Sequence, residues 1–227
     1  MLLKIIDFII NIIDKSYHQK RLIKTLKNIS DDYQLIIDVG FHRGEYSKLF
    51  LQYLFPKKII GFEASEKSYL NYIKKKKSSQ IELFNIGVSS KKGQAELKVY
   101  EKESINSFES LNPNSAYSKI KNNLLKLKAT HENVKLDTLD NLLHEFERID
   151  LLKIDVEGHE LDVLKGAKSC LNRTKIIMIE IHHSKQYSNY SKDEIIKLLE
   201  KSNFTLYKKI KFPLMKWEDR IFVNEKF

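Results

Sequence analysis

The sequence is poor in the residue types that define several protein classes. Its 227 residues include only 7 Gly, 3 Pro and 1 Cys. The scarcity of Gly and Pro excludes a collagen-like or low-complexity chain. The single cysteine, Cys170, excludes an intramolecular disulfide framework and a Cys-x-x-Cys metal module. It also favours a reducing compartment, so we expect a cytoplasmic location. With 42% hydrophobic and 31% charged residues, the composition predicts a folded chain with a substantial core.

The positive charge of the chain is carried mainly by lysine. The formal net charge is +10, and only 5 of the 40 basic residues are Arg. Nucleic-acid-binding proteins often use Arg to recognise guanine and phosphate, and the sequence has no Arg-rich patch and no separate RNA-binding module. We therefore do not expect nucleic acid as a partner. The run Lys74 to Lys77 fits the solvated end of a helix.

The N-terminus combines an apolar run with regularly spaced polar residues. Residues 2–13 are too few to span a bilayer, and no small-residue cleavage site of a secretory signal follows them. The polar residues recur every three or four positions, which places them on one helix face; they are Lys4, Asp7, Asn11, Asp14 and His18. We predict that residues 1–30 form an amphipathic helical segment that docks on the domain or makes a homodimer. The alternative is peripheral membrane contact, because basic residues follow the apolar run.

From residue 35 the sequence alternates between apolar strands and amphipathic helices. We expect strands at 35–39, 58–63, 81–88, 149–155 and 175–181, and helices at 45–55, 67–77, 138–146, 160–171 and 191–201. This alternation predicts a mostly parallel sheet covered on both faces. Two final strands, 204–210 and 220–223, are joined only by a loop, so one of them is antiparallel. Residues 31–227 are then one domain, in which the polar segment 101–130 forms an insertion or lid, between weaker strands at 94–100 and 134–136.

A glycine-containing turn follows the first predicted strand. It reads Asp38-Val39-Gly40-Phe41-His42-Arg43-Gly44. Glycines let a backbone turn tightly and come close to a ligand. The turn lacks the third glycine of the dinucleotide fingerprint, which disfavours a nicotinamide oxidoreductase, and it lacks the Lys-Ser/Thr of a phosphate loop. Alone, it also fits a tight turn without a ligand.

An acidic residue, Glu63, ends the second predicted strand, 19 residues after Gly44. In doubly wound folds an acid at this place accepts hydrogen bonds from ribose hydroxyls. The competing interpretation is a surface carboxylate. The turn and Glu63 together favour a nucleoside-containing ligand without a pyrophosphate, such as S-adenosylmethionine (SAM).

Acids and histidines gather after two later strands. The first group lies in Lys153-Ile154-Asp155-Val156-Glu157-Gly158-His159-Glu160, and the second in Glu180-Ile181-His182-His183. Open α/β sheets bind ligands at this edge. The candidates for taking a proton from an acceptor are Asp155, Glu157, His159 and His182. The alternative is that some of these charges only satisfy each other. No spacing typical of metal ligands stands out, so we predict no metal site.

Taken together, these motifs resemble the FkbM family of SAM-dependent methyltransferases. The resemblance spans roughly residues 34–183, and the block from Ile149 to Glu160, continued by Leu164-Lys165-Gly166-Ala167, is its most specific part. It implies a class I methyltransferase (Rossmann-like) three-layer fold, whose mostly parallel seven-stranded sheet has one antiparallel strand. It also implies O-methylation of a sugar, glycan precursor or secondary metabolite. The sequence departs from the family where Phe41 and His42 replace Ala-Asn and where Ala64 follows Glu63 in place of Pro.

The resemblance also assigns expected roles to the motif residues. Gly40, Phe41 and Gly44 would flank the methionine part of SAM, and Glu63 would hold the ribose. Asn85 and Gly87 would lie near the adenine, and Asp38 would hold the amino group. Two other functions stay open, a nucleic-acid methyltransferase and a non-catalytic binding protein that keeps the fold. The sequence does not specify the acceptor.

Overall fold

The computed structural model describes residues 17–75, 78–100, 106–115, 129–182, 186–188, 190–212 and 217–227. The apolar run 2–13 and most of the predicted lid 101–130 lie outside the described residues, as does His183. The predictions made for them stay predictions.

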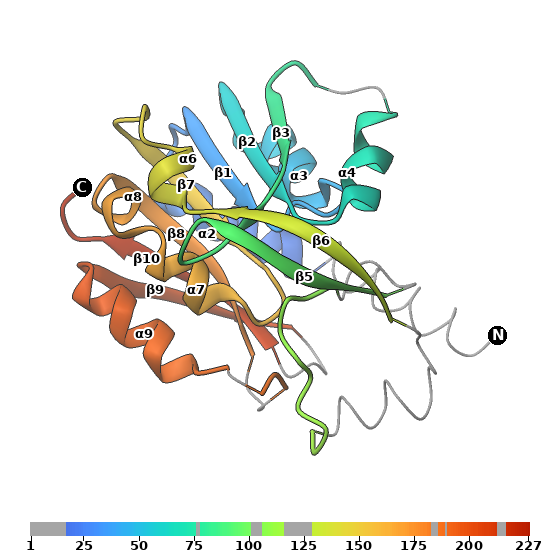
Figure 1. Cartoon of the computed structure of the whole chain (residues 1–227). Helices are drawn as coiled ribbons and strands as arrows, with labels where there is room; N and C mark the ends of the chain where they lie inside the picture. The colour runs from blue at the N-terminus through green and yellow to red at the C-terminus, as the bar shows by residue number, and fades with distance from the viewer. Residues whose placement is uncertain are drawn as a thin grey trace.

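A seven-stranded sheet forms the centre of the fold, with the strand order β3-β2-β1-β7-β8-β10-β9 (Figure 1). The strands are β1 (Leu35–Val39), β2 (Lys58–Glu63), β3 (Ile81–Asn85), β7 (Ile149–Ile154), β8 (Thr174–His182), β9 (Phe204–Lys211) and β10 (Trp217–Asn224). β10 is antiparallel to both of its neighbours, and the pairs from β3 to β8 are parallel. The predicted mostly parallel sheet with one antiparallel strand is confirmed.

Helices cover both faces of this sheet. One layer contains α2 (Gln19–Ile29), α3 (Glu45–Tyr53) and α4 (Glu66–Ile73); the other contains α6 (Leu139–Leu142), α7 (Glu160–Lys165), α8 (Lys168–Asn172) and α9 (Lys192–Lys201). The two layers arise because successive residues of a buried strand point to opposite faces. Ile36 packs in the core under α2, α3 and α4, whereas Ile37 packs in the core under α6 to α9. The predicted three-layer fold is confirmed.

Helix α2 is the described part of the predicted N-terminal segment, and it packs on the domain. Leu22, Ile23 and Leu26 on one of its faces are buried against the sheet. The Tyr33 hydroxyl donates a hydrogen bond of 2.7 Å to the Leu26 carbonyl and ties the end of α2 to the chain that leads into β1. Among the described helices, none has the length and apolar character needed to cross a membrane.

A second, three-stranded sheet was not predicted. It consists of β4 (Gly87–Val88), β6 (Ala129–Asp137) and β5 (Gly93–Tyr100), in that order. The expected single strand 81–88 is therefore wrong, because the chain leaves the large sheet after Asn85 and pairs with β6 from Gly87 onward. A Cβ on Gly87 would lie 2.6 Å from the Leu136 side chain, so glycine allows this close pairing. The expected short strand 134–136 extends back to Ala129, and this part of 101–130 is strand rather than lid.

The predicted helix 160–171 is divided into α7 and α8. The break falls at Gly166, where a Cβ would lie 2.1 Å from the Ser89 carbonyl oxygen. The backbone of the β4 segment thus passes against the turn between the two helices. This contact joins the small sheet to the helical layer under the carboxyl end of β7.

Candidate active site

Two loops meet at the carboxyl edge of the large sheet, one after β1 and one after β7. Gly40 has a positive φ of +80°, and a Cβ there would lie 1.8 Å from the Asp155 carbonyl oxygen. The Asp155 amide donates a hydrogen bond of 3.1 Å to the Val39 carbonyl. Only glycine allows this approach. The loop after β1 is therefore held directly against the residue that follows β7.

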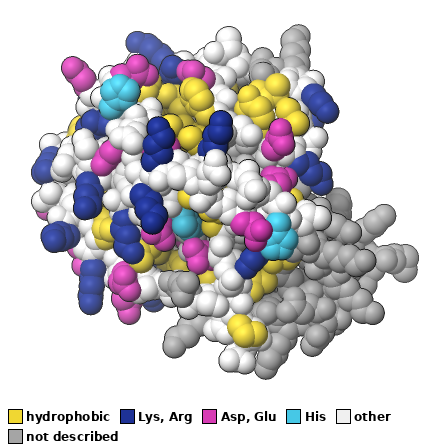
Figure 2. Space-filling model, viewed as in Figure 1, with side chains coloured by type: hydrophobic (Ala, Val, Ile, Leu, Met, Phe, Trp, Pro, Cys, Tyr) yellow, Lys and Arg dark blue, Asp and Glu magenta, His cyan; other side chains and the backbone are white. Residues whose placement is uncertain are grey.

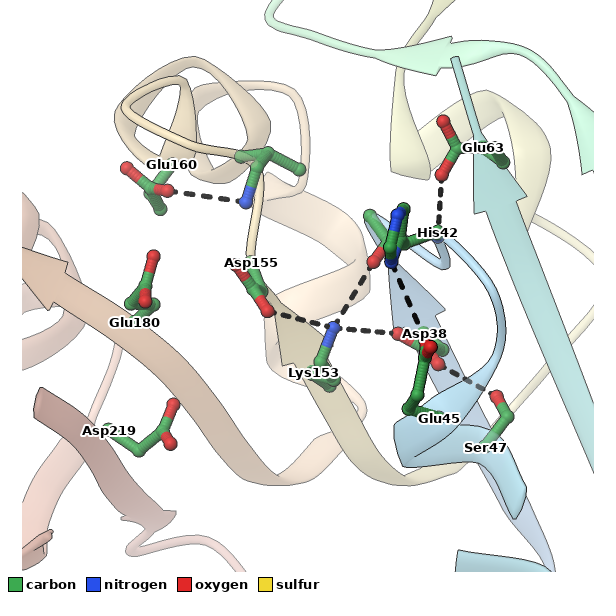
Figure 3. Close-up of polar contacts among 12 residues, drawn as sticks. Asp38, His42, Glu45, Ser47, Glu63, Lys153, Asp155, Glu160, Glu180 and Asp219 are labelled. Atoms are coloured by element: carbon green, nitrogen blue, oxygen red, sulfur yellow. Dashed lines mark hydrogen bonds and ion pairs between the residues drawn. The ribbon is translucent and has the colours of Figure 1, made fainter. Parts of the chain in front are cut away.

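A buried ion-pair network lies beneath this contact (Figure 3). Lys153 Nζ lies 2.9 Å from Asp38 Oδ1 and 3.4 Å from Asp155 Oδ2, and the Ser47 hydroxyl donates to Asp38 Oδ2 at 2.7 Å. Burial lowers the pKa of Lys153, but Asp38 and Asp155 more than offset this effect and raise it. Both carboxylate oxygens of Asp38 are thus engaged within the protein. Asp38 fixes the turn and Lys153, and its contact with a cofactor amino group stays a prediction.

Glu63 lies at the end of β2, beside the turn that follows β1. Its carboxylate accepts backbone hydrogen bonds from His42 at 2.6 Å and from Ser65 at 2.9 Å. Burial raises the pKa of Glu63, and these two hydrogen bonds oppose the rise. Each carboxylate oxygen has a second lone pair that can still accept. Glu63 can therefore accept hydroxyl hydrogen bonds from a ligand while it orients the turn.

The other predicted cofactor residues surround this position in different ways. Asn85 ends β3, and its side chain donates to the Glu63 carbonyl at 2.9 Å. Phe41 is buried, and its ring packs against Tyr72 with ring centroids 4.7 Å apart, so its predicted contact with the cofactor stays a prediction. A Cβ on Gly44 would lie 2.6 Å from that ring. Gly87 belongs to β4 and packs against β6, and its proximity to adenine stays a prediction.

A group of acids lies on the other side of Lys153. Figure 3 shows Asp155, Glu180 and Asp219 side by side, from the loop after β7, from β8 and from β10. Glu180 and Asp219 are directly opposite each other in the β8–β10 register. Burial raises the pKa of Glu180 well above its usual range, and the neighbouring Asp155, Asp219 and Glu160 raise it further. The edge of the sheet is thus strongly acidic although the whole chain is basic.

Glu157 faces the same group from the loop after β7. Its φ of 52° is unusual for a residue other than glycine. The Tyr187 hydroxyl donates a hydrogen bond to Glu157 Oε2, and the Ser107 hydroxyl donates to its backbone carbonyl at 2.6 Å. Burial, reinforced by Glu180, raises the pKa of Glu157 to about 8. The conformation of Glu157 is therefore fixed by contacts with two separate segments.

The two histidines proposed as proton acceptors differ in their surroundings. His159 Nδ1 lies 2.9 Å from Glu109 Oε1, and its Nε2 lies 3.0 Å from the Ser89 hydroxyl. Both nitrogens of His159 are therefore engaged, and its ring links the loop after β7 to the region beside β4. His182 is buried at the end of β8, 3.2 Å from Glu180 Oε2, and neither of its nitrogens has a hydrogen-bond partner among the described residues. Asp155, Glu157 and His182 gather around Glu180, and His159 does not.

Sequence reasoning did not find several residues of this region. His18, at the start of α2, is buried with its Nε2 2.6 Å from Asp219 Oδ2. Burial raises the pKa of Asp219, and the hydrogen bond from His18 opposes the rise. Tyr187 holds Glu157 from the segment after β8. These pairs join positions far apart in the chain, and no local motif marks them.

The basic residues do not form one continuous patch on the face drawn in Figure 2. Lys and Arg side chains are interspersed with Asp and Glu there. This distribution fits a solvated surface.

Comparison with known protein families identifies the family to which this chain belongs. Residues 38–206, most of the chain, match the family model described as the methyltransferase FkbM domain. The chain belongs to the FkbM methyltransferase family. The family resemblance predicted from the sequence is confirmed.

Solved structures share the fold of this FkbM-family chain at low sequence identity, and one curated protein matches a short stretch of its sequence. The FkbM methyltransferase structure from Methylobacillus flagellatus KT is 12% identical with a TM-score of 0.53, over 85% of this chain and 44% of that one. The magnesium protoporphyrin IX methyltransferase from Synechocystis PCC 6803 with bound SAM is 12% identical with a TM-score of 0.53, over 91% and 78%. The hexuronic acid methyltransferase AglP of Haloferax volcanii is 45% identical over 38 residues, which are 17% of this chain and 16% of AglP. The chain thus covers less than half of the first structure and a small part of AglP.

Proposed function

We propose that this chain transfers the methyl group of SAM to a hydroxyl oxygen of a sugar or glycan precursor. The observation that carries the proposal is the meeting of the Gly40 turn, Glu63 and Asp155 at the carboxyl ends of adjacent strands. A nucleoside ligand and a reacting hydroxyl can be held at one edge by this arrangement. The membership in a methyltransferase family supports the reaction type.

The residues of the site fit SAM. Glu63 has lone pairs available for the two ribose hydroxyls, and its neighbour His42 is held so that the turn after β1 keeps its shape. Asn85 ends the adjacent strand β3, on the expected adenine side. SAM, when bound, supplies a methyl group on a positively charged sulfur. The partly exposed Asp155, which pairs with Lys153, places a carboxylate at this edge, and a negative charge there suits such a sulfur.

The acceptor hydroxyl must lose its proton, and we assign that proton to Asp155. The Asp155 side chain is 30% exposed, whereas that of Lys153 beside it is 2% exposed. A ligand can therefore reach Asp155 while Lys153 holds it from the interior. The backbone contact with Gly40 fixes Asp155 next to the proposed cofactor turn. A base held within reach of the reacting hydroxyl contributes both orientation and proton transfer.

A sugar acceptor is supported by two observations. Carboxyl groups accept hydrogen bonds from hydroxyl groups, and the loop after β7 carries two that are only partly buried, Asp155 and Glu157. The partial similarity to a hexuronic acid methyltransferase points to the same acceptor class. The acceptor proposed here is therefore a hydroxylated sugar, free or within a glycan precursor.

The test is transfer of a labelled methyl group from SAM to a panel of hexuronic acid glycosides, neutral sugar glycosides and RNA. We expect incorporation into at least one sugar. Asp155→Asn should lower kcat by about 100-fold or more without changing the affinity for S-adenosylhomocysteine. Asp31→Asn is the matched control, because Asp31 is exposed and lies in the turn before β1. Incorporation into RNA alone, or full activity of Asp155→Asn, would contradict the proposal.

A further inference from the structure

Three side chains beside the proposed acceptor position form a compact cluster of metal-ligand types, which we call the Glu157–Glu180–His182 cluster. We propose that this cluster binds one divalent metal ion, and that the ion holds an oxygen of the acceptor sugar. The binding of the ion is independent of the proposed function, whereas its role toward the acceptor rests on it. The sequence indicated no such site, because one ligand comes from the loop after β7 and the other two from strand β8.

The geometry of the cluster fits a single ion. One ligand atom from each of the three residues can be chosen so that all lie within 4.8 Å of one another, and His182 Nε2 lies 3.2 Å from Glu180 Oε2. Oxygen and nitrogen ligands bind such ions at about 2.0–2.2 Å, so two ligands of one ion lie about 3 to 4.4 Å apart. Small rotations of the side chains would bring all three to these distances.

The cluster contains buried polar atoms without partners. Glu180 Oε2 and both ring nitrogens of His182 have no hydrogen-bond partner among the described residues. His182 is 3% exposed and Glu180 is 8% exposed. Buried polar atoms in folded proteins are nearly always paired. The close approach of His182 to Glu180 does not have hydrogen-bond geometry, and a shared metal ion would satisfy both groups.

Neighbouring side chains hold two of the three ligands in place, Glu157 and His182. The Tyr187 hydroxyl donates to Glu157 Oε2, and the rings of Tyr187 and Tyr190 lie edge-on to His182, with centroids 5.2 and 5.4 Å away. Outer contacts of this kind orient metal ligands in known sites. The cluster is thus pre-arranged by aromatic side chains that follow β8.

The charge balance around the cluster also calls for a cation. Asp155, Glu160 and Asp219 surround Glu180, with Lys153 as the opposing charge. A bound cation would balance part of the negative charge that these carboxyl groups carry when ionised.

The ligand types indicate the kind of ion and what it could do. Two carboxylates and one imidazole suit Mn²⁺ and similar first-row divalent ions. Three protein ligands leave coordination positions open for water or a substrate oxygen. The neighbouring Asp155 would remain available to accept the proton of that hydroxyl.

A second set of similar residues, Glu109, His159 and Asp162, provides a control. Its ligand atoms also lie within 4.8 Å of one another. Both nitrogens of His159 are already engaged by Glu109 and Ser89, however, so no unpaired group points into that set. We expect no ion there, and Glu109→Gln should leave metal binding unchanged.

The experiment is a titration of chelator-treated full-length protein with Mn²⁺, followed by the electron paramagnetic resonance signal of free Mn²⁺. Wild type should bind one Mn²⁺ per chain. Glu180→Gln and His182→Gln should each weaken this binding at least tenfold, and Glu109→Gln should not. Circular dichroism identifies the variants that keep the fold. Two different ligands are substituted so that the test still works if one of the two variants misfolds.

The outcomes separate this inference from the proposed function. S-adenosylhomocysteine binding is measured on the same samples. A folded wild type that binds S-adenosylhomocysteine but does not bind Mn²⁺ would overturn the metal site alone. Mn²⁺ binding that is weakened by Glu109→Gln but not by Glu180→Gln would overturn the assignment of its ligands. A folded wild type that binds Mn²⁺ at the predicted site but does not bind S-adenosylhomocysteine would support the metal site and contradict the proposed function.

Discussion

Replacement of Lys153 by methionine tests the buried ion-pair network most severely. Lys153 is 2% exposed and pairs with Asp38 at 2.9 Å and with Asp155 at 3.4 Å. The substitution Lys153→Met leaves the side-chain volume similar and removes the only positive charge of this network. Breaking a buried ion pair by removing one partner costs about 3–5 kcal/mol.

The structure places the expected loss at the lower end of that range. Asp38 keeps its hydrogen bond from the Ser47 hydroxyl, and the Asp155 side chain is 30% exposed and can be hydrated. We therefore expect Lys153→Met to lower the free energy of unfolding by about 3 kcal/mol. For a chain of this size, such a loss lowers Tm by roughly 6–12 °C.

Urea unfolding measures this difference, with the fluorescence of Trp217 and far-UV circular dichroism as two probes. Trp217 is the only tryptophan of the chain. The double substitution Asp38→Asn with Lys153→Met should recover part of the loss, because it removes the unpaired charge. A loss below about 1 kcal/mol for Lys153→Met, or a double variant much less stable than the single one, would refute the argument.

The pH dependence of the same variant follows from the raised pKa of Lys153. A lysine whose pKa is higher in the folded state contributes stability that is complete below its unfolded pKa of about 10.4 and is lost only above it. The difference between wild type and Lys153→Met should therefore stay constant from about pH 7 to 9. A difference that disappears within this window would contradict the assignment.

Three further substitutions or modifications test the packing. Gly40→Ala should lower the free energy of unfolding in urea titrations by at least about 2 kcal/mol, because Gly40 has a φ of +80° and the Asp155 carbonyl oxygen would lie 1.8 Å from the new Cβ. Gly93→Ala is the control, because its new Cβ would meet nothing within 4 Å, and its free energy of unfolding should fall much less. Leu26→Ala should lower the free energy of unfolding by about 2–5 kcal/mol, because Leu26 is fully buried against the sheet. An unchanged Tm would contradict the docking of α2. Burial raises the pKa of the Cys170 thiol to about 12. A thiol reagent at pH 8 should therefore modify Cys170 only as fast as the protein unfolds. Rapid labelling of the native protein would contradict this burial.

Much of the large sheet could be predicted from the sequence because its strands are apolar and its helices are bounded by clear signals. Ser191 and Thr138 stand where two predicted helices begin, and each accepts a hydrogen bond from the backbone amide three residues on. The strand ends also placed Gly40, Glu63 and Asp155 at one edge, because the carboxyl ends of parallel strands meet there. These are local patterns combined with one general rule of topology.

The parts that could not be predicted depend on contacts between distant segments. The divided strand after Asn85 and the break at Gly166 result from close backbone packing with β6 and Ser89. His18 reaches Asp219 across 201 positions of the chain. Such pairings are set by the tertiary arrangement, and no period or spacing encodes them.

The same limit applies to the histidines of the site. His159 lies within the most specific motif in the sequence, yet its nitrogens contact Glu109 and Ser89. His182 lies in a less specific run but enters the acidic group beside Glu180. Sequence position placed both histidines at the correct edge, and only the side-chain surroundings separate their roles.

The most direct test of the central claim is calorimetric titration of the purified chain with S-adenosylhomocysteine, beside Glu63→Gln and the exposed control Glu145→Gln. The account predicts one binding site in wild type and in Glu145→Gln. Glu63→Gln should remain folded and bind about 10- to 100-fold more weakly, because a charged hydrogen-bond acceptor is worth about 1.5–3 kcal/mol. A folded wild type that does not bind S-adenosylhomocysteine, or a Glu63→Gln variant that binds it as tightly as wild type, would contradict the assignment of this edge as the cofactor site.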